Sequence, residues 1–139
     1  YEEIDIEGNK TGIRVTGPKK ITKTGMFNYC WPGCLTVMYD AMKVGIIQIE
    51  DIKKNNDYAM WLKVCKKANG FLLDECLAFY RKGRVGSVST HSIKTMILWH
   101  YKLYHDAENM GVIKSLFNTG RNLIFGFYKK CKYVSKEND

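Results

Sequence analysis

Residues 56–68 read NDYAMWLKVCKKA and decide how the rest of the chain is interpreted. Apolar side chains recur here at the spacing of one helix face: Tyr58, Trp61, Leu62, Cys65 and Ala68. Lysines occupy the opposite side, and Asn69-Gly70 follows as a stop signal. The pattern predicts an amphipathic helix that begins at Asp57 and buries its aromatic face.

Before this helix the sequence alternates between strand and turn signals. Residues 1–15 alternate weakly around Glu7-Gly8-Asn9 and predict a hairpin. Residues 21–30 favour a short helix or a loop. Residues 35–39, LTVMY, form an apolar run after Trp31-Pro32-Gly33 and predict a buried strand, because the run is too short for a helix.

After the helix, residues 71–80 predict one or two short strands, and residues 83–90 a glycine- and serine-rich loop. Two helices are expected next, over residues 91–106 and 110–130. The first carries one apolar stripe: Ile93, Met96, Ile97, Tyr101 and Tyr104.

The last helix combines a wide apolar stripe with five positive charges, and no acidic residue lies between positions 110 and 134. Two interpretations stay open. The stripe packs on the domain core, which is the commoner arrangement and the one we expect, or residues 110–134 lie on an anionic membrane surface.

Composition places the chain among single globular domains, and the elements expected along it, mixed short strands and two or three helices, indicate the α/β class. The 139 residues carry 22 Lys+Arg against 14 Asp+Glu, a net charge of +8 that favours anionic partners. Five cysteines without metal-ligand spacing predict buried free thiols in a reducing compartment. His100 and His105 fall on different sides of a helix, so we expect no metal site in this chain.

Two side chains could carry chemistry. Asp57, at the first turn of the predicted helix, is either a cap for the helix N-terminus or a rigidly supported general base. Arg81, beside the glycine-rich loop, is either an ordinary surface charge or a bidentate phosphate ligand.

Four segments taken together resemble the second half of bacterial family 2 glycosyltransferases: residues 30–39, 56–62, 77–81 and 86–89. The resemblance implies the C-terminal part of a GT-A fold, with residues 1–109 as the acceptor-side half and residues 110–139 as a basic amphipathic helix and tail. In that family the donor half carries an Asp-x-Asp motif that holds Mg²⁺ or Mn²⁺. These residues lack that motif, so the metal is expected to be held elsewhere in the full-length enzyme and this fragment to be inactive alone.

The resemblance also assigns roles to individual residues. Asp57 occupies the position of the catalytic base of an inverting transfer. Substrate-binding roles are implied for five further residues: Trp31, Gly33, Asn56, Tyr80 and Arg81. Asn56 departs from the Glu or Gln usual at its position. The family's Gln-x-x-Arg-Trp string is absent, which favours addition of single sugars.

The expected function is therefore transfer of a sugar from a nucleotide-sugar donor to a saccharide or lipid-linked hydroxyl acceptor in bacterial cell-surface polysaccharide synthesis. We expect a cytoplasmic location, peripheral on the inner face of the membrane, and pairing of exposed strand edges into a homodimer. The alternative is a basic polyanion- or nucleic-acid-binding module without catalysis, although the dispersed lysines make nucleic acid a poor partner. A third class, an interaction domain, predicts a compact structure with no open cleft at Asp57.

Overall fold

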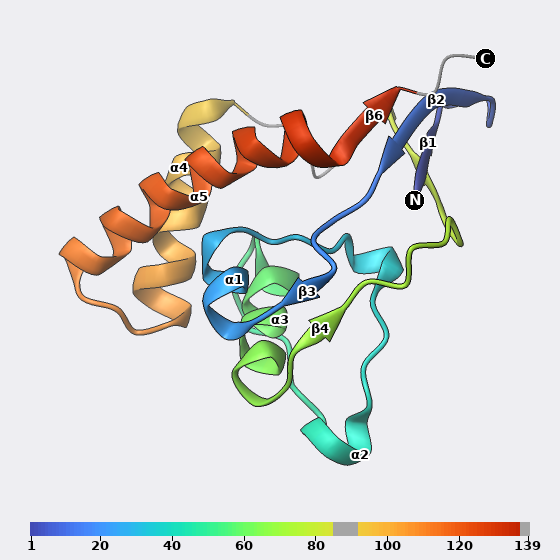
Figure 1. Ribbon diagram of the computed structural model, residues 1–139. Coiled ribbons are helices and arrows are strands. Elements are labelled where there is room, and N and C mark those ends of the chain that lie inside the picture. The colour runs from blue at the N-terminus through green and yellow to red at the C-terminus, as the bar shows by residue number, and fades with distance from the viewer. Residues whose placement is uncertain (85–91, 137–139) are drawn as a thin grey trace.

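The computed structural model of the chain describes residues 1–84 and 92–136 (Figure 1). Its core is built around α3 (Asn56–Lys67), the helix that the sequence predicts. The side chains of Tyr58, Trp61, Leu62 and Cys65 are buried, whereas Ala68 lies just beyond the helix and is exposed. The aromatic face therefore points inward, as its spacing indicates.

Two small sheets accompany the helices. The predicted hairpin consists of β1 (Glu2–Ile4) and β2 (Lys10–Val15), and Gly8 takes a positive φ of 99° in its turn. β5 (Phe79–Arg81) pairs parallel to β1, and β6 (Val134–Lys136) pairs antiparallel to β2, which gives the order β5-β1-β2-β6. A second pair joins β3 (Lys20–Ile21) to β4 (Gly70–Phe71). The strands expected within residues 71–80 are thus β4 and β5.

The strand predicted over residues 35–39 is wrong. The segment forms a 3₁₀ turn at Cys34–Thr36 and then runs on to the short helix α2 (Ala41–Val44). Met38 is 94% exposed. Strand propensity is realised only where a neighbouring strand completes the ladder, and no described strand pairs with this run.

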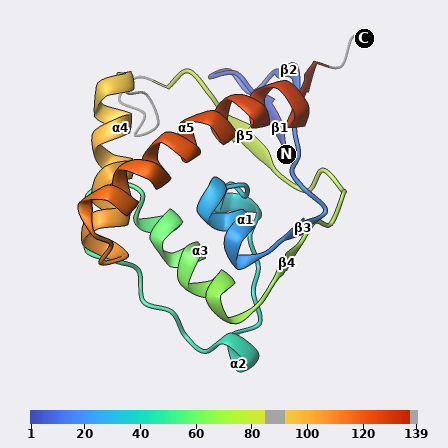
Figure 2. The same cartoon turned by 60° about the vertical axis from the view of Figure 1, so that its left-hand side comes forward.

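The helical part closes with α1 (Lys23–Asn28), α4 (Ile93–Lys102), a π-helical turn at Leu103–Ala107 and α5 (Val112–Tyr133). The expected helices over residues 91–106 and 110–130 are confirmed. In the apolar stripe predicted for residues 91–106, only Tyr104 is fully buried, and Ile93 is exposed. Figure 2 shows α5 running across α1, with α4 beside its N-terminal half.

The orientation of α5 contradicts the expectation that its apolar stripe packs on the core. The buried residues of this helix are polar: Ser115, Asn118, Thr119 and Asn122. Its exposed residues are mostly apolar, and we call the following set the α5 stripe: Val112, Ile113, Leu116, Phe117, Ile124 and Phe127. No helix in the described part of the chain is long and apolar enough to cross a membrane.

Hydrogen bonds explain why the polar face can be buried. Asn122 Nδ2 donates to the Tyr58 hydroxyl at 3.2 Å and to the Tyr104 hydroxyl at 3.3 Å. Thr119 Oγ1 donates to the Ser115 carbonyl at 2.8 Å. Buried polar groups that keep partners avoid the desolvation penalty of an unsatisfied group, so this face is compatible with the interior.

Candidate active site

Asp57 lies in the first turn of α3, and its side chain is half-buried. Its Oδ1 accepts a hydrogen bond from the Tyr58 backbone N–H at 2.8 Å. Asn55, the residue before the helix, is in the left-handed region and provides no side-chain cap. Oδ2 of Asp57 accepts no hydrogen bond from the described residues. The carboxylate therefore contacts the helix start with one of its oxygens.

A buried hydrogen-bond network holds the start of α3 in place. The Tyr58 hydroxyl donates to the Met26 carbonyl at 2.7 Å, and the Tyr104 hydroxyl donates to the Phe27 carbonyl at 3.1 Å. Because Asn122 donates to both hydroxyls, the network ties α3, α5 and the π-helical turn to α1. Asp57 is thus carried by a packed and fully connected support, which a general base requires.

The Trp31–Gly33 loop lies near Asp57. Burial and then the negative charge of Asp57 raise the pKa of the Cys30 thiol, and the same two causes raise the pKa of Cys34. These cysteines flank the Trp31–Gly33 loop, so the negative charge of Asp57 acts at both ends of it. Two of the residues expected to bind substrate, Trp31 and Gly33, lie between these cysteines in the sequence.

Trp31 is buried and fixed from two sides. Its Nε1 donates to the Gly25 carbonyl at 2.8 Å, and Lys129 Nζ donates to the Trp31 carbonyl at 2.8 Å. The ring also makes edge-on contacts with four aromatic neighbours: Tyr29, Phe125, Tyr128 and Tyr133. Burial lowers the pKa of Lys129. The contacts of Trp31 therefore position the loop, and the hydrogen bond from Lys129 connects the loop to α5.

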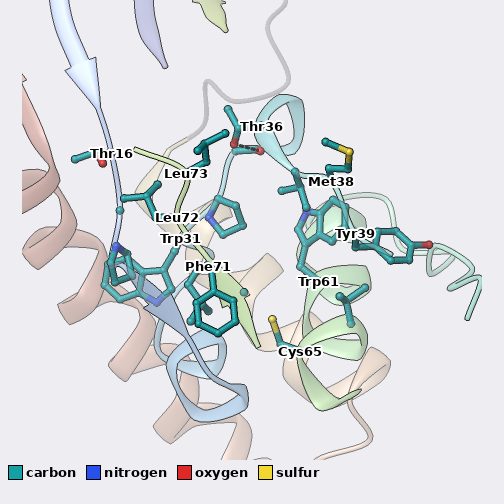
Figure 3. A pocket seen from close by; sticks show the side chains of 18 of the residues that line it. Thr16, Trp31, Thr36, Met38, Tyr39, Trp61, Cys65, Phe71, Leu72 and Leu73 are labelled. Atoms are coloured by element: carbon teal, nitrogen blue, oxygen red, sulfur yellow. Dashed lines mark hydrogen bonds between the residues drawn. The ribbon is translucent and has the colours of Figure 1, made fainter. Parts of the chain in front are cut away.

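Beyond the loop lies an apolar cavity of about 720 Å³ (Figure 3). Trp31 and Trp61 lie on opposite sides of it, and Tyr39 and Phe71 also contribute their rings. Gly33 is among the lining residues, but Asp57 is not. The Trp31–Gly33 loop therefore borders the cavity, whereas the Asp57 carboxylate lies outside its lining.

Asn56 and the Tyr80-Arg81 pair have different surroundings. Asn56 Oδ1 accepts from the Asp57 backbone N–H at 2.9 Å, so this side chain helps to shape the helix start. The Tyr80 ring lies 5.7 Å from that of Tyr1. Arg81 Nη1 donates to the carbonyls of Asp5 and Ile6, at 3.1 and 2.6 Å, and so braces the hairpin turn. The structure does not bring Arg81 to Asp57, and residues 86–89 lie outside the described residues.

Among the described residues, no group of three or more His, Cys, Asp or Glu side chains is placed to hold a metal ion. His100 packs against Tyr58, and burial lowers the pKa of its imidazole. All five cysteines are free thiols, but Cys34 and Cys131 are exposed, contrary to the expectation that the thiols are buried.

The polar face of α5 is the functional feature that the sequence analysis missed. Its members stand at positions 115, 118, 119 and 122, a helical spacing that runs in parallel with the more conspicuous apolar stripe. This spacing is visible in the sequence. Whether the polar face is buried depends on the hydroxyls of Tyr58 and Tyr104, which belong to other segments.

Comparison with known proteins gives two relatives. The chain is 30% identical over 119 residues to an uncharacterized glycosyltransferase of Haemophilus influenzae, a match covering 84% of this chain and 46% of that protein. It is 37% identical over 82 residues to the putative teichuronic acid biosynthesis glycosyltransferase TuaG of Bacillus subtilis, covering 58% of this chain and 32% of TuaG. No protein-family model and no solved structure matches. The chain is thus related to glycosyltransferases and spans at most about half the length of these relatives.

Proposed function

We propose that the intact protein is an inverting glycosyltransferase of the family 2 type, with a GT-A fold, and that Asp57 is its catalytic base. The observation that carries the proposal is the similarity to two glycosyltransferases, one of which extends over 84% of this chain. The placement of Asp57 in the first turn of α3 supports it, because the hydrogen bond from the Tyr58 N–H to Oδ1 orients the carboxylate.

In the proposed reaction, Asp57 Oδ2 accepts the proton of an acceptor hydroxyl as that oxygen attacks the anomeric carbon of the donor sugar. The new carbon–oxygen bond forms on the face opposite the leaving group. The bond to the nucleoside diphosphate breaks, and its electron pair leaves with the diphosphate. Configuration is inverted, and Asp57 finishes the step protonated.

Other residues are proposed to position the substrates. The Trp31–Gly33 loop would border the acceptor, and Asn56 would hold Asp57 in orientation. The hydrogen bonds of Arg81 to the hairpin turn favour a structural role, and Tyr80 contacts Tyr1 within the same sheet. The metal implied by the family resemblance does not fit the described residues, so no proposed step passes through it.

The name of the Bacillus subtilis relative supports a role in cell-surface polysaccharide synthesis. We propose that the intact protein adds single sugars from a nucleotide-sugar donor to a saccharide or lipid-linked acceptor at the cytoplasmic face of the membrane. A polyanion-binding module without catalysis is the less favoured function, since both relatives carry the name of glycosyltransferases.

The test is release of nucleoside diphosphate by the intact protein from a panel of sugar nucleotides, with Mg²⁺ or Mn²⁺ supplied. Asp57→Asn keeps an acceptor for the Tyr58 N–H but removes the basic oxygen. We expect the wild type to turn over one donor, and we expect the turnover rate of Asp57→Asn to be about 10²- to 10⁴-fold lower.

Asp51→Asn is the matched control, because Asp51 is an exposed carboxylate in the loop before the same helix. Donor binding and the urea midpoint of both variants should equal those of the wild type. Unchanged turnover in Asp57→Asn would leave this carboxylate a helix cap. If no donor is turned over, the glycosyltransferase proposal itself fails.

A further inference from the structure

The α5 stripe is an unpartnered apolar surface on an otherwise well-anchored helix. Ile113 is 83% exposed and Phe127 is 71% exposed, whereas the polar face of the same helix is buried. An ordinary surface helix has the opposite arrangement. The hydrogen bonds of Asn122 to Tyr58 and Tyr104 hold α5 in this orientation, so the stripe cannot turn inward without breaking them.

Positive charges border the α5 stripe on both sides. Helical periodicity places Lys130 along one border, and Lys114, Arg121 and Lys132 along the other. None of these four side chains forms an ion pair with an acid in the described part of the chain. The helix and its flanks, residues 110–134, contain no acidic residue at all.

This distribution is complementary to one kind of occupant. A core of the same chain or a second copy would need only apolar contacts, whereas rows of cations along an apolar strip match the headgroups and acyl boundary of an anionic bilayer.

We infer that α5 lies in the plane of an anionic membrane surface, with the α5 stripe inserted among the lipids and Lys114, Arg121, Lys130 and Lys132 at the headgroups. The helix rests on the bilayer and does not cross it. This inference does not depend on the proposed reaction, because neither Asp57 nor the Trp31–Gly33 loop takes part.

The experiment is flotation of the intact protein with phosphatidylcholine vesicles, with and without phosphatidylglycerol. We expect binding to the anionic vesicles at low salt and weaker binding at about 0.15 M salt, where surface charges are partly screened. In the triple variant Ile113→Ser, Phe117→Ser and Ile124→Ser, the affinity for these vesicles should fall by about tenfold at least.

Two further variants separate the contributions. Met42→Ser with Ile46→Ser removes two apolar groups of 96% and 89% exposure from the region of α2, away from α5 (Figure 1), and should leave binding unchanged. Replacing Lys114, Lys130 and Lys132 by Gln should weaken binding to the anionic vesicles by about fivefold for each charge and leave binding to neutral vesicles unchanged.

Retention of the wild-type urea midpoint would show that the triple variant is folded. Three results would overturn the inference: absence of binding to anionic vesicles at low salt, binding that survives the triple substitution, or a wild-type dimer without vesicle affinity that the triple variant converts to a monomer. The last result would assign the stripe to a second copy of the chain.

Discussion

The negative charge of Asp57 acts on the thiol of Cys34, and the electrostatics of this pair can be measured without any substrate. Cys34 is exposed, yet partial burial of its thiol and the nearby Asp57 carboxylate raise its pKa. A thiol with a raised pKa holds less thiolate at neutral pH and reacts more slowly with alkylating reagents.

We predict that Asp57→Asn accelerates alkylation of Cys34 by iodoacetamide at pH 7.5. Removing the negative charge lowers the pKa of the thiol and therefore increases its thiolate fraction at this pH. Mass spectrometry of the labelled peptides gives the rate. Cys131 on α5 is also exposed and serves as the internal standard, with no change expected. An unaltered Cys34 rate would mean that the carboxylate does not act on the Cys34 thiol.

At the scale of elements, α5 is held by close contacts along one side only. Gly126 lies where the Tyr29 ring approaches, and a Cβ added there would stand 3.0 Å from the ring. Gly120 in the same helix has no such neighbour within 4 Å. The two glycines thus have the same secondary structure and different surroundings.

This pair yields a stability prediction. Gly120→Ala should raise the free energy of unfolding by about 1 kcal/mol, because alanine has the higher helix propensity and meets no obstacle. Gly126→Ala should show no such gain, since the Tyr29 ring must move. Urea denaturation followed by circular dichroism measures both. Equal gains at the two positions would show that α5 does not pack against Tyr29.

The elements themselves were largely predictable from local patterns. The hairpin, α3 and the two C-terminal helices follow from period and turn signals that need no distant partner. The strand expected over residues 35–39 failed because strand formation depends on a neighbour, and none of the described strands supplies one. The site was only partly predictable: the resemblance indicated Asp57 and the Trp31–Gly33 loop, whereas the contacts of Arg81 emerged only in three dimensions.

At the scale of the whole molecule, some of the 22 Lys and Arg side chains are engaged with acids and so are less available to polyanions. Several lysines are paired with acids in the described structure: Lys10 with Glu2, Lys63 with Glu50, Lys66 with Glu108 and Lys82 with Glu3. In each pair the carboxylate lowers the local positive potential around its lysine.

We therefore predict only weak, sequence-independent retention of duplex DNA by the intact protein. Retention in a gel-shift assay should be detectable at about 50 mM salt and absent at about 200 mM, because few phosphates are contacted at once. Lys114→Gln with Lys130→Gln should lower the low-salt retention, since these charges are exposed and unpaired with described acids. Persistent binding at the higher salt concentration would favour the polyanion-binding alternative.

The sequence alone determined where helices and turns lie, the excess of positive charge and the kinship with glycosyltransferases. These depend on residue spacing and composition, which are local properties. Only the tertiary structure decided which face of α5 is buried, because both faces are periodic and the choice rests on the hydroxyls of Tyr58 and Tyr104 meeting Asn122 from distant positions. Hydrogen-bond partners contributed by other segments, and not hydrophobicity along the chain, set that orientation.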